Sequence, residues 1–130
     1  MSQKILNPEK VCLPVGPYSQ GILTQGSGAW LHIAGQIGMT QDGLLGGSFS
    51  EQADLAWQNL IHVLNEAGMD SSHLVKVVTY IVDAADVPLL APVRLQYLQD
   101  ARPAATLVVV NALARAEWKV EVEAVAFKAN

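Results

Sequence analysis

Apolar runs separated by glycine-rich or polar turns predict five strands along this chain. Residues 18–24, 29–37, 74–83, 106–111 and 118–127 are rich in β-branched side chains or alternate apolar with polar positions. The first two are separated by "QGSG", whose glycines permit a tight reversal, so a hairpin is expected there. In the last, apolar residues alternate with Lys119, Glu121 and Glu123, which predicts one buried face and one wet or functional face.

A first helix is predicted after the glycine-rich turn "TQDGLLGG". Ser48 followed three residues later by Glu51 is typical of a capping box, in which each side chain satisfies a free backbone donor. Gly68 is a permissive helix end. Between these signals, apolar residues recur at helical spacing, namely Ala53, Ala56, Leu60, Val63, Leu64 and Ala67. This helix is expected to cover a sheet with one face.

A second helix is predicted from Asp86, although Pro88 and Pro92 confine regular helix to the part after Ala91. The resulting order is strand, strand, helix, strand, helix, strand, strand. That order is typical of an α+β domain in which helices pack on a mixed sheet. The other face of such a sheet needs cover, and a partner subunit is expected to supply it.

The composition narrows the class of protein. A chain of 130 residues with 51% hydrophobic and 15% charged residues suits one domain, residues 1–130, that associates with other copies. The net charge is −4 without any long basic cluster, so nucleic acid is not an expected partner. Cys12 is the only cysteine, which excludes an internal disulfide and fits a reducing compartment. Without a signal peptide or an apolar run of about 18 residues, a cytoplasmic protein with no membrane partner is expected.

Few side chains suggest chemistry by spacing alone. Glu121 and Glu123 leave the same face of a strand about 7 Å apart, which suits two-carboxylate chemistry and equally suits a solvated face. Pro17 precedes Tyr18 and could hold it over a cleft, although a buried core tyrosine fits as well. The histidines, His32, His62 and His73, lie in different predicted elements, so no metal site is expected.

Six motifs together carry a family resemblance. They are "GPYSQG" (16–21), "IAGQIG" (33–38), "QNLIHVLNEAGMD" (58–70), "LVKVVTYIVD" (74–83), "RPAAT" (102–106) and "VEVEAVA" (120–126). In order and spacing the chain resembles the Rid family, also called YjgF-like, whose type member is the enamine/imine deaminase RidA. The resemblance implies a chorismate-mutase-like α+β domain with a mixed six-stranded sheet and two helices on one face. It also implies a homotrimer with a central barrel, a small-molecule cleft between each pair of subunits, and no cofactor.

The resemblance also implies site residues. Glu121 matches the glutamate that positions the attacking water, and Tyr18 matches the tyrosine of the cleft, so these two are the predicted catalytic residues. The arginine that clamps the substrate carboxylate in deaminating members is Ala105 here. Further departures place alanine or leucine where the family often has serine, asparagine or cysteine. The expected cleft comprises Ala34, Gly35, Ala91, Arg94, Ala105, Thr106 and Leu107.

The missing arginine leaves the activity open. Arg102 lies three residues before the family position, about 10 Å away along an extended chain, so it is not a substitute. Arg94 or Arg115 could enter the cleft from a neighbouring subunit. One hypothesis is a hydrolase for an imine or enamine that is uncharged or anchored differently. The others are a binding protein without turnover, an endoribonuclease, which the acidic charge disfavours, and a vestigial cleft.

Overall fold

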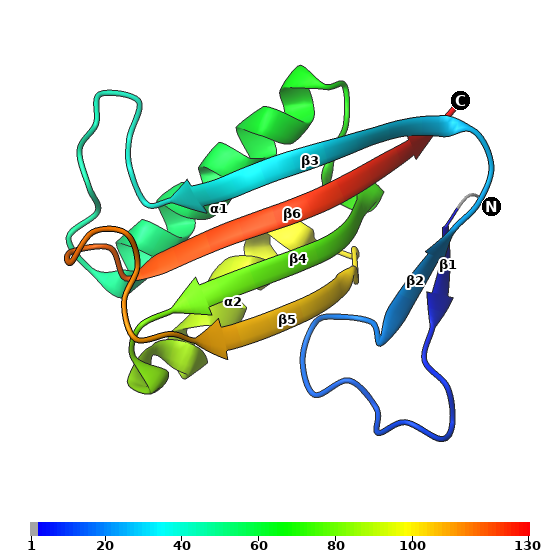
Figure 1. Ribbon diagram of the computed structural model, residues 1–130, viewed down its shortest axis with the longest axis horizontal. Coiled ribbons are helices and arrows are strands. Elements are labelled where there is room, and N and C mark those ends of the chain that lie inside the picture. The colour runs from blue at the N-terminus through cyan, green and yellow to red at the C-terminus, as the bar shows by residue number, and fades with distance from the viewer. Residues whose placement is uncertain (1–2) are drawn as a thin grey trace.

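Six strands form two sheets in the computed structural model, which describes residues 3–130 (Figure 1). β1 (Gln3–Leu6) and β2 (Gly21–Thr24) make a small antiparallel sheet. The main sheet has the order β3-β6-β4-β5, with bounds β3 Gly28–Ile37, β4 Leu74–Ile81, β5 Ala104–Val109 and β6 Val120–Ala129. β4 and β5 run parallel and the other neighbours run antiparallel, so the sheet is mixed and β5 forms one edge.

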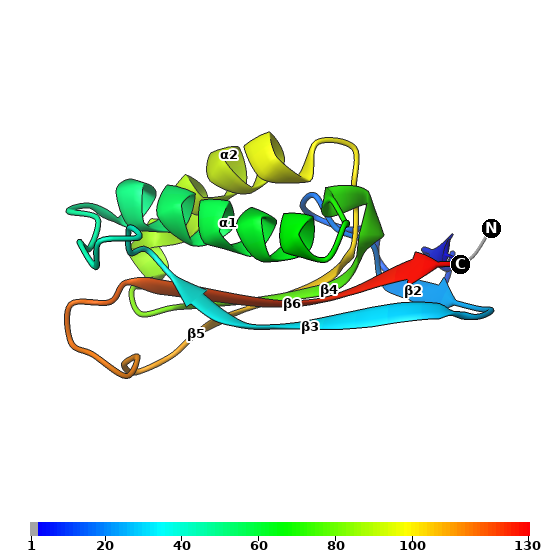
Figure 2. The ribbon, with the colours of Figure 1, turned by 90° about the horizontal axis from the view of Figure 1, so that it is seen from above.

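Both helices pack on the same face of the main sheet (Figure 2). α1 (Phe49–Glu66) begins where the capping signal predicts, because the Ser48 side chain accepts a hydrogen bond from the Glu51 backbone N–H at 3.2 Å. The apolar side chains of α1 share one core with β6, and the fully buried ones include Trp57, Leu60, Val120 and Val122. The predicted α+β class is therefore confirmed.

α2 (Val87–Leu98) starts earlier than the proline argument predicts. Pro88 lies in the first helical turn, where a backbone N–H has no partner within the helix and its loss costs little. Pro92 lies inside the helix and removes only the bond to the carbonyl of residue 88. A 3-10 turn (Ala84–Asp86) leads into α2, so the prolines shape its beginning without delaying it.

Two predictions about strand pairing are wrong. Residues 18–24 and 29–37 do not form a hairpin, and the six strands do not form a single sheet. β2 pairs with β1, a strand that the sequence pattern missed, and the strands divide into a pair and a group of four. β3 and β6, with ten residues each, pair with each other in the main sheet. β1 and β2 have four residues each. An isolated bridge between Ser19 and Ala104 connects the turn before β2 to the edge strand β5.

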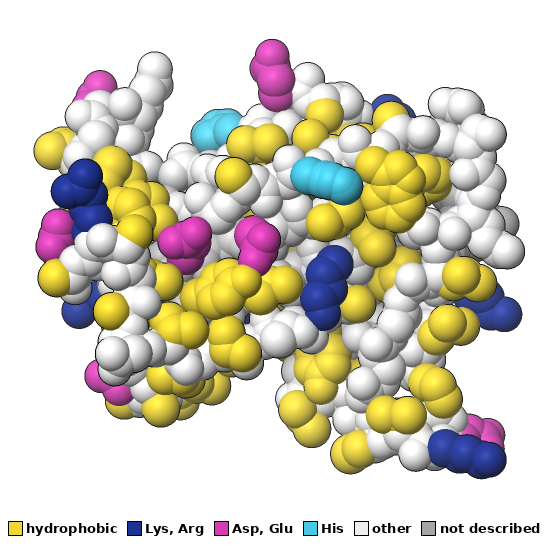
Figure 3. Space-filling model, viewed as in Figure 1, with side chains coloured by type: hydrophobic (Ala, Val, Ile, Leu, Met, Phe, Trp, Pro, Cys, Tyr) yellow, Lys and Arg dark blue, Asp and Glu magenta, His cyan; other side chains and the backbone are white. Residues whose placement is uncertain are grey.

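The main sheet has one covered face and one open face. Along β6, Val120 and Val122 are fully buried under the helices, so the alternating Glu121 and Glu123 lie on the opposite side. Figure 3 views that open face, where charged side chains lie among apolar ones. Trp30 is 52% exposed there and packs on Phe127, with 4.8 Å between the ring centroids. The polar face predicted for the last strand is confirmed, and the trimeric barrel stays a prediction.

Candidate functional site

A cavity of about 470 Å³ lies between α2, the turn before β2 and the edge strand β5. We call it the α2–β5 cavity, and its lining residues are Val15, Gly16, Pro17, Tyr18, Val87, Pro88, Ala91, Arg94, Ala105 and Leu107. Five of the residues predicted from the sequence therefore meet in one place. Of the other five, Pro17 was singled out as the residue that could hold Tyr18 over a cleft, whereas Val15, Gly16, Val87 and Pro88 were missed.

Hydrogen bonds attach the Tyr18 turn to the chain that enters β5. The Tyr18 backbone N–H donates to the Gly16 carbonyl at 2.8 Å, which tightens the turn at Pro17. The next residue, Ser19, is buried, and its backbone N–H donates to the Pro103 carbonyl at 3.0 Å. The Ser19 hydroxyl donates to the Arg102 carbonyl at 2.5 Å. These bonds place the Tyr18 ring beside the start of β5, where the family arginine position, 105, is found.

Arg94 extends from α2 into the same cavity. Its Nε is buried without a hydrogen-bond partner, and no ion pair to Arg94 is formed within residues 3–130. A Cβ at Gly16 would lie 3.7 Å from the Tyr18 ring and 3.9 Å from Nη2 of Arg94, so both groups border one small space. Burial lowers the pKa of Arg94 below its ordinary value. Arg94, one of the predicted cleft residues, therefore lies in the cavity of its own chain, without the entry from a neighbouring subunit that the sequence left possible.

Glu121 lies in a second cavity, on the open face of the sheet. This space of about 350 Å³, here called the Glu121 pocket, is lined by Gly35, Tyr80, Val110, Ala112, Leu113, Ala114, Glu121 and Glu123. A side chain at Gly35 would overlap the Glu121 carboxylate, so glycine is what lets that carboxylate lie over β3. The Tyr80 hydroxyl donates to the Glu123 carboxylate, a bond that raises the pKa of Tyr80 above 10.0. The Glu123 carboxylate therefore already has a hydrogen-bond partner, whereas the Glu121 carboxylate has none within residues 3–130.

The two predicted catalytic residues lie on opposite faces of the sheet. Tyr18 and Ala105 are on the helix side, and Glu121 is on the open side with Gly35. Thr106 also points to the open side, where its hydroxyl accepts a hydrogen bond from Lys76 Nζ at 2.8 Å. Ala34 is exposed at the irregularity in β3 between Ile33 and Gln36 and lines neither cavity. One chain therefore holds two separate halves of the predicted site.

The Arg102 side chain lies outside both cavities and forms hydrogen bonds to the backbone. Its Nη1 donates to the carbonyls of Gln99 and Ala101, each at 2.7 Å. These carbonyls follow the end of α2, where the last helical carbonyls have no partners within the helix. Arg102 thus caps the connection between α2 and β5, as expected for a residue that cannot replace the family arginine.

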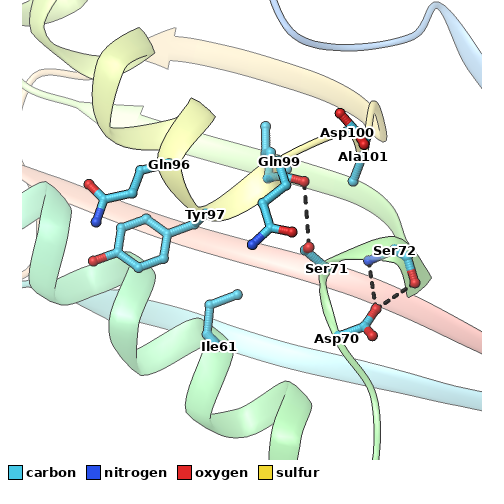
Figure 4. A pocket seen from close by; sticks show the side chains of 10 residues that line it. Ile61, Asp70, Ser71, Ser72, Gln96, Tyr97, Gln99, Asp100 and Ala101 are labelled. Carbon is cyan, nitrogen blue, oxygen red and sulfur yellow. Dashed lines mark hydrogen bonds between the residues drawn. The ribbon is translucent and has the colours of Figure 1, made fainter.

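A third cavity, of about 520 Å³, is lined by residues of both helices and of the 3-10 turn Ser71–His73 (Figure 4). None of its lining residues was predicted for the site. The Asp70 carboxylate accepts hydrogen bonds from the Ser72 hydroxyl at 2.5 Å and the Ser72 backbone N–H at 2.9 Å. These bonds, the hydroxyl first, lower the pKa of Asp70. The Asp70 and Ser72 side chains of this cavity are thus hydrogen-bonded to each other.

Residues 3–130 contain no cluster of three side chains that could coordinate a metal ion. Within the same range, every helix is too short or too polar to span a membrane.

Comparison with known proteins identifies relatives over nearly the whole chain. The model of the family described as endoribonuclease L-PSP matches residues 9–128. A 2-iminobutanoate/2-iminopropanoate deaminase of Bos taurus is 33% identical over 126 residues, covering 95% of this chain and 89% of the relative. A RutC family protein of Pyrococcus abyssi is 32% identical over 130 residues, covering 98% and 99%.

The same relationship is visible in three dimensions. The crystal structure of YyfB from Yersinia pestis, a member of the Rid protein family, matches this chain with a TM-score of 0.87 at 31% identity. The match covers 97% of this chain and 98% of YyfB. On these grounds the chain belongs to the endoribonuclease L-PSP family, the Rid or RutC family that its motifs indicate.

Proposed function

We propose that this protein hydrolyses a small imine or enamine in a cleft shared by two copies of the chain. The supporting observation is the division of the predicted site, with Tyr18 and Ala105 on one face of the sheet and Glu121 on the other. No single copy presents both groups to one small molecule. The α2–β5 cavity of one subunit would meet the Glu121 pocket of the next, as expected for a homotrimer with clefts between subunits.

The chain has an edge strand and exposed apolar side chains that suit such an assembly. β5 is an edge strand, and its last residues, Val108 and Val109, are 37% and 50% exposed. On the open face, β3 at the other edge of the sheet carries the exposed Trp30. Apolar surface of this kind on a small acidic protein favours burial between copies of the chain. The edge position of β5 also places the α2–β5 cavity at the rim of the sheet, where a neighbour can reach it.

Glu121 would act as the general base. Its carboxylate accepts a proton from a water molecule while the water oxygen bonds to the carbon of the C=N group. The nitrogen is protonated, the C–N bond of the resulting carbinolamine breaks, and ammonia leaves as the carbonyl product forms. One water is consumed and one ammonia released per imine, so neither an oxidant nor a reductant is needed. The Tyr18 ring would pack against the substrate from the opposite side of the cleft.

The substrate must be anchored by something other than residue 105. The bovine relative is named for two imines that carry a carboxylate, 2-iminobutanoate and 2-iminopropanoate. In this chain Ala105 and Leu107 give that part of the cavity an apolar surface. A substrate that is uncharged there, or held at another point, fits this lining better than one that requires an arginine at position 105.

The test is imine hydrolysis by the purified protein. Imines with a carboxylate are made in place by an amino-acid oxidase and uncharged imines by an amine oxidase, and both are trapped with semicarbazide. We expect faster imine loss with the protein, and a decrease of about 100-fold or more in Glu121→Gln. Glu117→Gln, the same change at an exposed glutamate before β6, is the matched control and should leave the rate unchanged. Full activity in Glu121→Gln would contradict the proposal.

Ala105 itself favours one alternative, a protein that binds a small metabolite without turning it over. This reading predicts ligand binding in the cleft with no acceleration of hydrolysis for either class of imine. An endoribonuclease is disfavoured by the net charge of −4. RNA binding would weaken steeply as salt rises, whereas binding in a partly apolar cleft should respond little.

A further inference from the structure

The side chain of Arg94 extends into the α2–β5 cavity. Nε of Arg94 is buried and makes no hydrogen bond within residues 3–130, and none of the residues lining the cavity is acidic. The Arg94 side chain as a whole is half-buried, and partial burial of a cation without a counter-charge is unfavourable, which is the cause of its lowered pKa. The guanidinium therefore borders an open cavity with donors that no group within residues 3–130 uses, and a ligand that enters the cavity can accept from them.

We propose that the Arg94 guanidinium binds the carboxylate of a small organic acid in the α2–β5 cavity. Arg94 would thereby supply from α2 the cation that is absent at position 105 on the facing strand. As an anchor for a substrate, this role rests on the proposed function. As an anion site it does not, because binding can be measured without turnover.

The chemistry of the cavity suits the carboxylate of a small acid. A guanidinium presents parallel N–H donors that match the two oxygens of a carboxylate. The Tyr18 hydroxyl accepts a hydrogen bond from the Val15 backbone N–H at 3.4 Å, which leaves its own O–H free to donate to a ligand. The remaining lining is mostly apolar, including Val87, Pro88 and Leu107. A single cation above an apolar floor suits a monoanion with a short hydrocarbon body.

The other arginines of the chain are less suited to this role. Arg102 already donates to the carbonyls of Gln99 and Ala101. Arg115 is exposed in the loop between β5 and β6 and lines neither cavity. Both serve as comparisons for Arg94, because each can receive the same substitution.

The experiment is calorimetric binding of pyruvate and 2-oxobutanoate to the protein in its natural oligomeric state, with inorganic phosphate and uncharged acetone as further probes. We expect both 2-oxo acids to bind and acetone to bind far more weakly. Arg94→Gln should weaken binding of the acids by about tenfold or more, because a charge-assisted pair is lost. The matched control Arg102→Gln should bind them as the unmodified protein does. Circular dichroism and sedimentation check the fold and the assembly of each variant.

Two further variants test the proposal, and Arg94→Lys does so even if Arg94→Gln does not fold. Arg94→Lys retains the charge but loses the paired donors, so its affinity for the acids should be a few-fold lower. The double variant Arg94→Gln with Ala105→Arg moves the cation across the cavity and should restore much of the affinity lost in Arg94→Gln.

Several results would overturn the proposal. Unchanged affinity in Arg94→Gln, or in Arg94→Lys where the first does not fold, would show that Arg94 does not hold the acid. Loss of binding in Arg115→Gln alone would assign the site to the loop. Tighter binding of phosphate than of either acid would exclude a carboxylate site. If no acid binds and Arg94→Gln instead dissociates the assembly, Arg94 is paired with a carboxylate of a neighbouring subunit. A failure of imine hydrolysis with acid binding intact would contradict the proposed function and leave the anion site standing.

Discussion

The covered and open faces of the main sheet differ in what the chain itself provides. On the covered face, Val120 and Val122 of β6 are fully buried with the apolar side of α1. On the open face the same strand presents Glu121 and Glu123, and Trp30 on β3 is 52% exposed. One face is therefore a finished core, and the other carries polar groups and apolar surface together. Changes on the covered face should therefore act on stability, and changes on the open face should act on association and activity.

The largest effect is expected at the centre of the covered face. Trp57→Ala removes a fully buried indole that stacks with Tyr97 at a centroid distance of 6.1 Å. It should lower the free energy of unfolding by about 3–5 kcal/mol, measured by urea denaturation. Trp57→Phe is the control, because the indole N–H has no partner within residues 3–130 and its loss alone should cost much less. An equal decrease in the free energy of unfolding in both variants would contradict the view that buried apolar volume stabilises the core at this position.

A matched pair on β6 sharpens the comparison of the two faces. Val122→Ala, on the covered face, should cost about 2 kcal/mol of unfolding free energy at any protein concentration. Val125→Ala, on the open face, should cost less at low concentration and should weaken association of the subunits, followed by sedimentation. If the two variants behave alike in both measurements, the open face is not an interface.

The next effect tests what glycine does on the open face. Gly35→Ala places a methyl group where the Glu121 carboxylate lies, and a flexible side chain can move away without unfolding the protein. We expect hydrolysis of the preferred imine to fall by about tenfold or more, since misplaced catalytic groups lose rate steeply. The melting temperature should change little. Gly43→Ala tests the opposite situation, because Gly43 has open space around it and a φ of 85°, so strain there should lower stability and spare the rate.

The smallest effect concerns pH. The hydrogen bond to Glu123 raises the pKa of Tyr80 above the ordinary 10.0, so the folded state holds this proton more tightly than the unfolded state. The stabilisation is complete below pH 10 and is lost as pH rises through the folded-state pKa of Tyr80. In an ultraviolet titration, Tyr80→Phe should show one tyrosine fewer among those that ionise at high pH. Glu123→Gln should bring the Tyr80 transition to lower pH, and an unchanged transition would contradict this cause.

The sequence predicted the elements of the fold better than their partners. Helical spacing and the Ser48 cap located α1, and alternation on β6 separated Val122 from Glu121 correctly. The pairing of β2 was mispredicted, because a local glycine turn suggested a hairpin while a four-residue strand at the N-terminus, β1, competes for the same edge. A strand so short has too few positions for a pattern to stand out.

The site was predicted in part for a similar reason. Motifs identified Tyr18, Ala105 and Glu121 as cleft positions, but a one-dimensional pattern does not show that two of them face the helices and one faces away. Alternation around Val120 would have placed Glu121 on the open face if it had been combined with the position of α2. The burial of Arg94 has no sequence signal, because it depends on how the Gly16 turn closes against α2.

Mixing two inactive variants tests the central claim, that each site is shared by two copies, most directly. Glu121→Gln keeps an intact α2–β5 cavity, whereas Ala105→Trp fills that cavity and keeps Glu121. Subunits of the two variants are dissociated, combined in equal amounts and reassembled, and exchange is verified by native mass spectrometry. Random mixing should create intact sites at about a quarter of all clefts, so hydrolysis should return to about a quarter of the unmodified rate. A mixture that exchanges subunits fully and stays inactive would contradict the shared site.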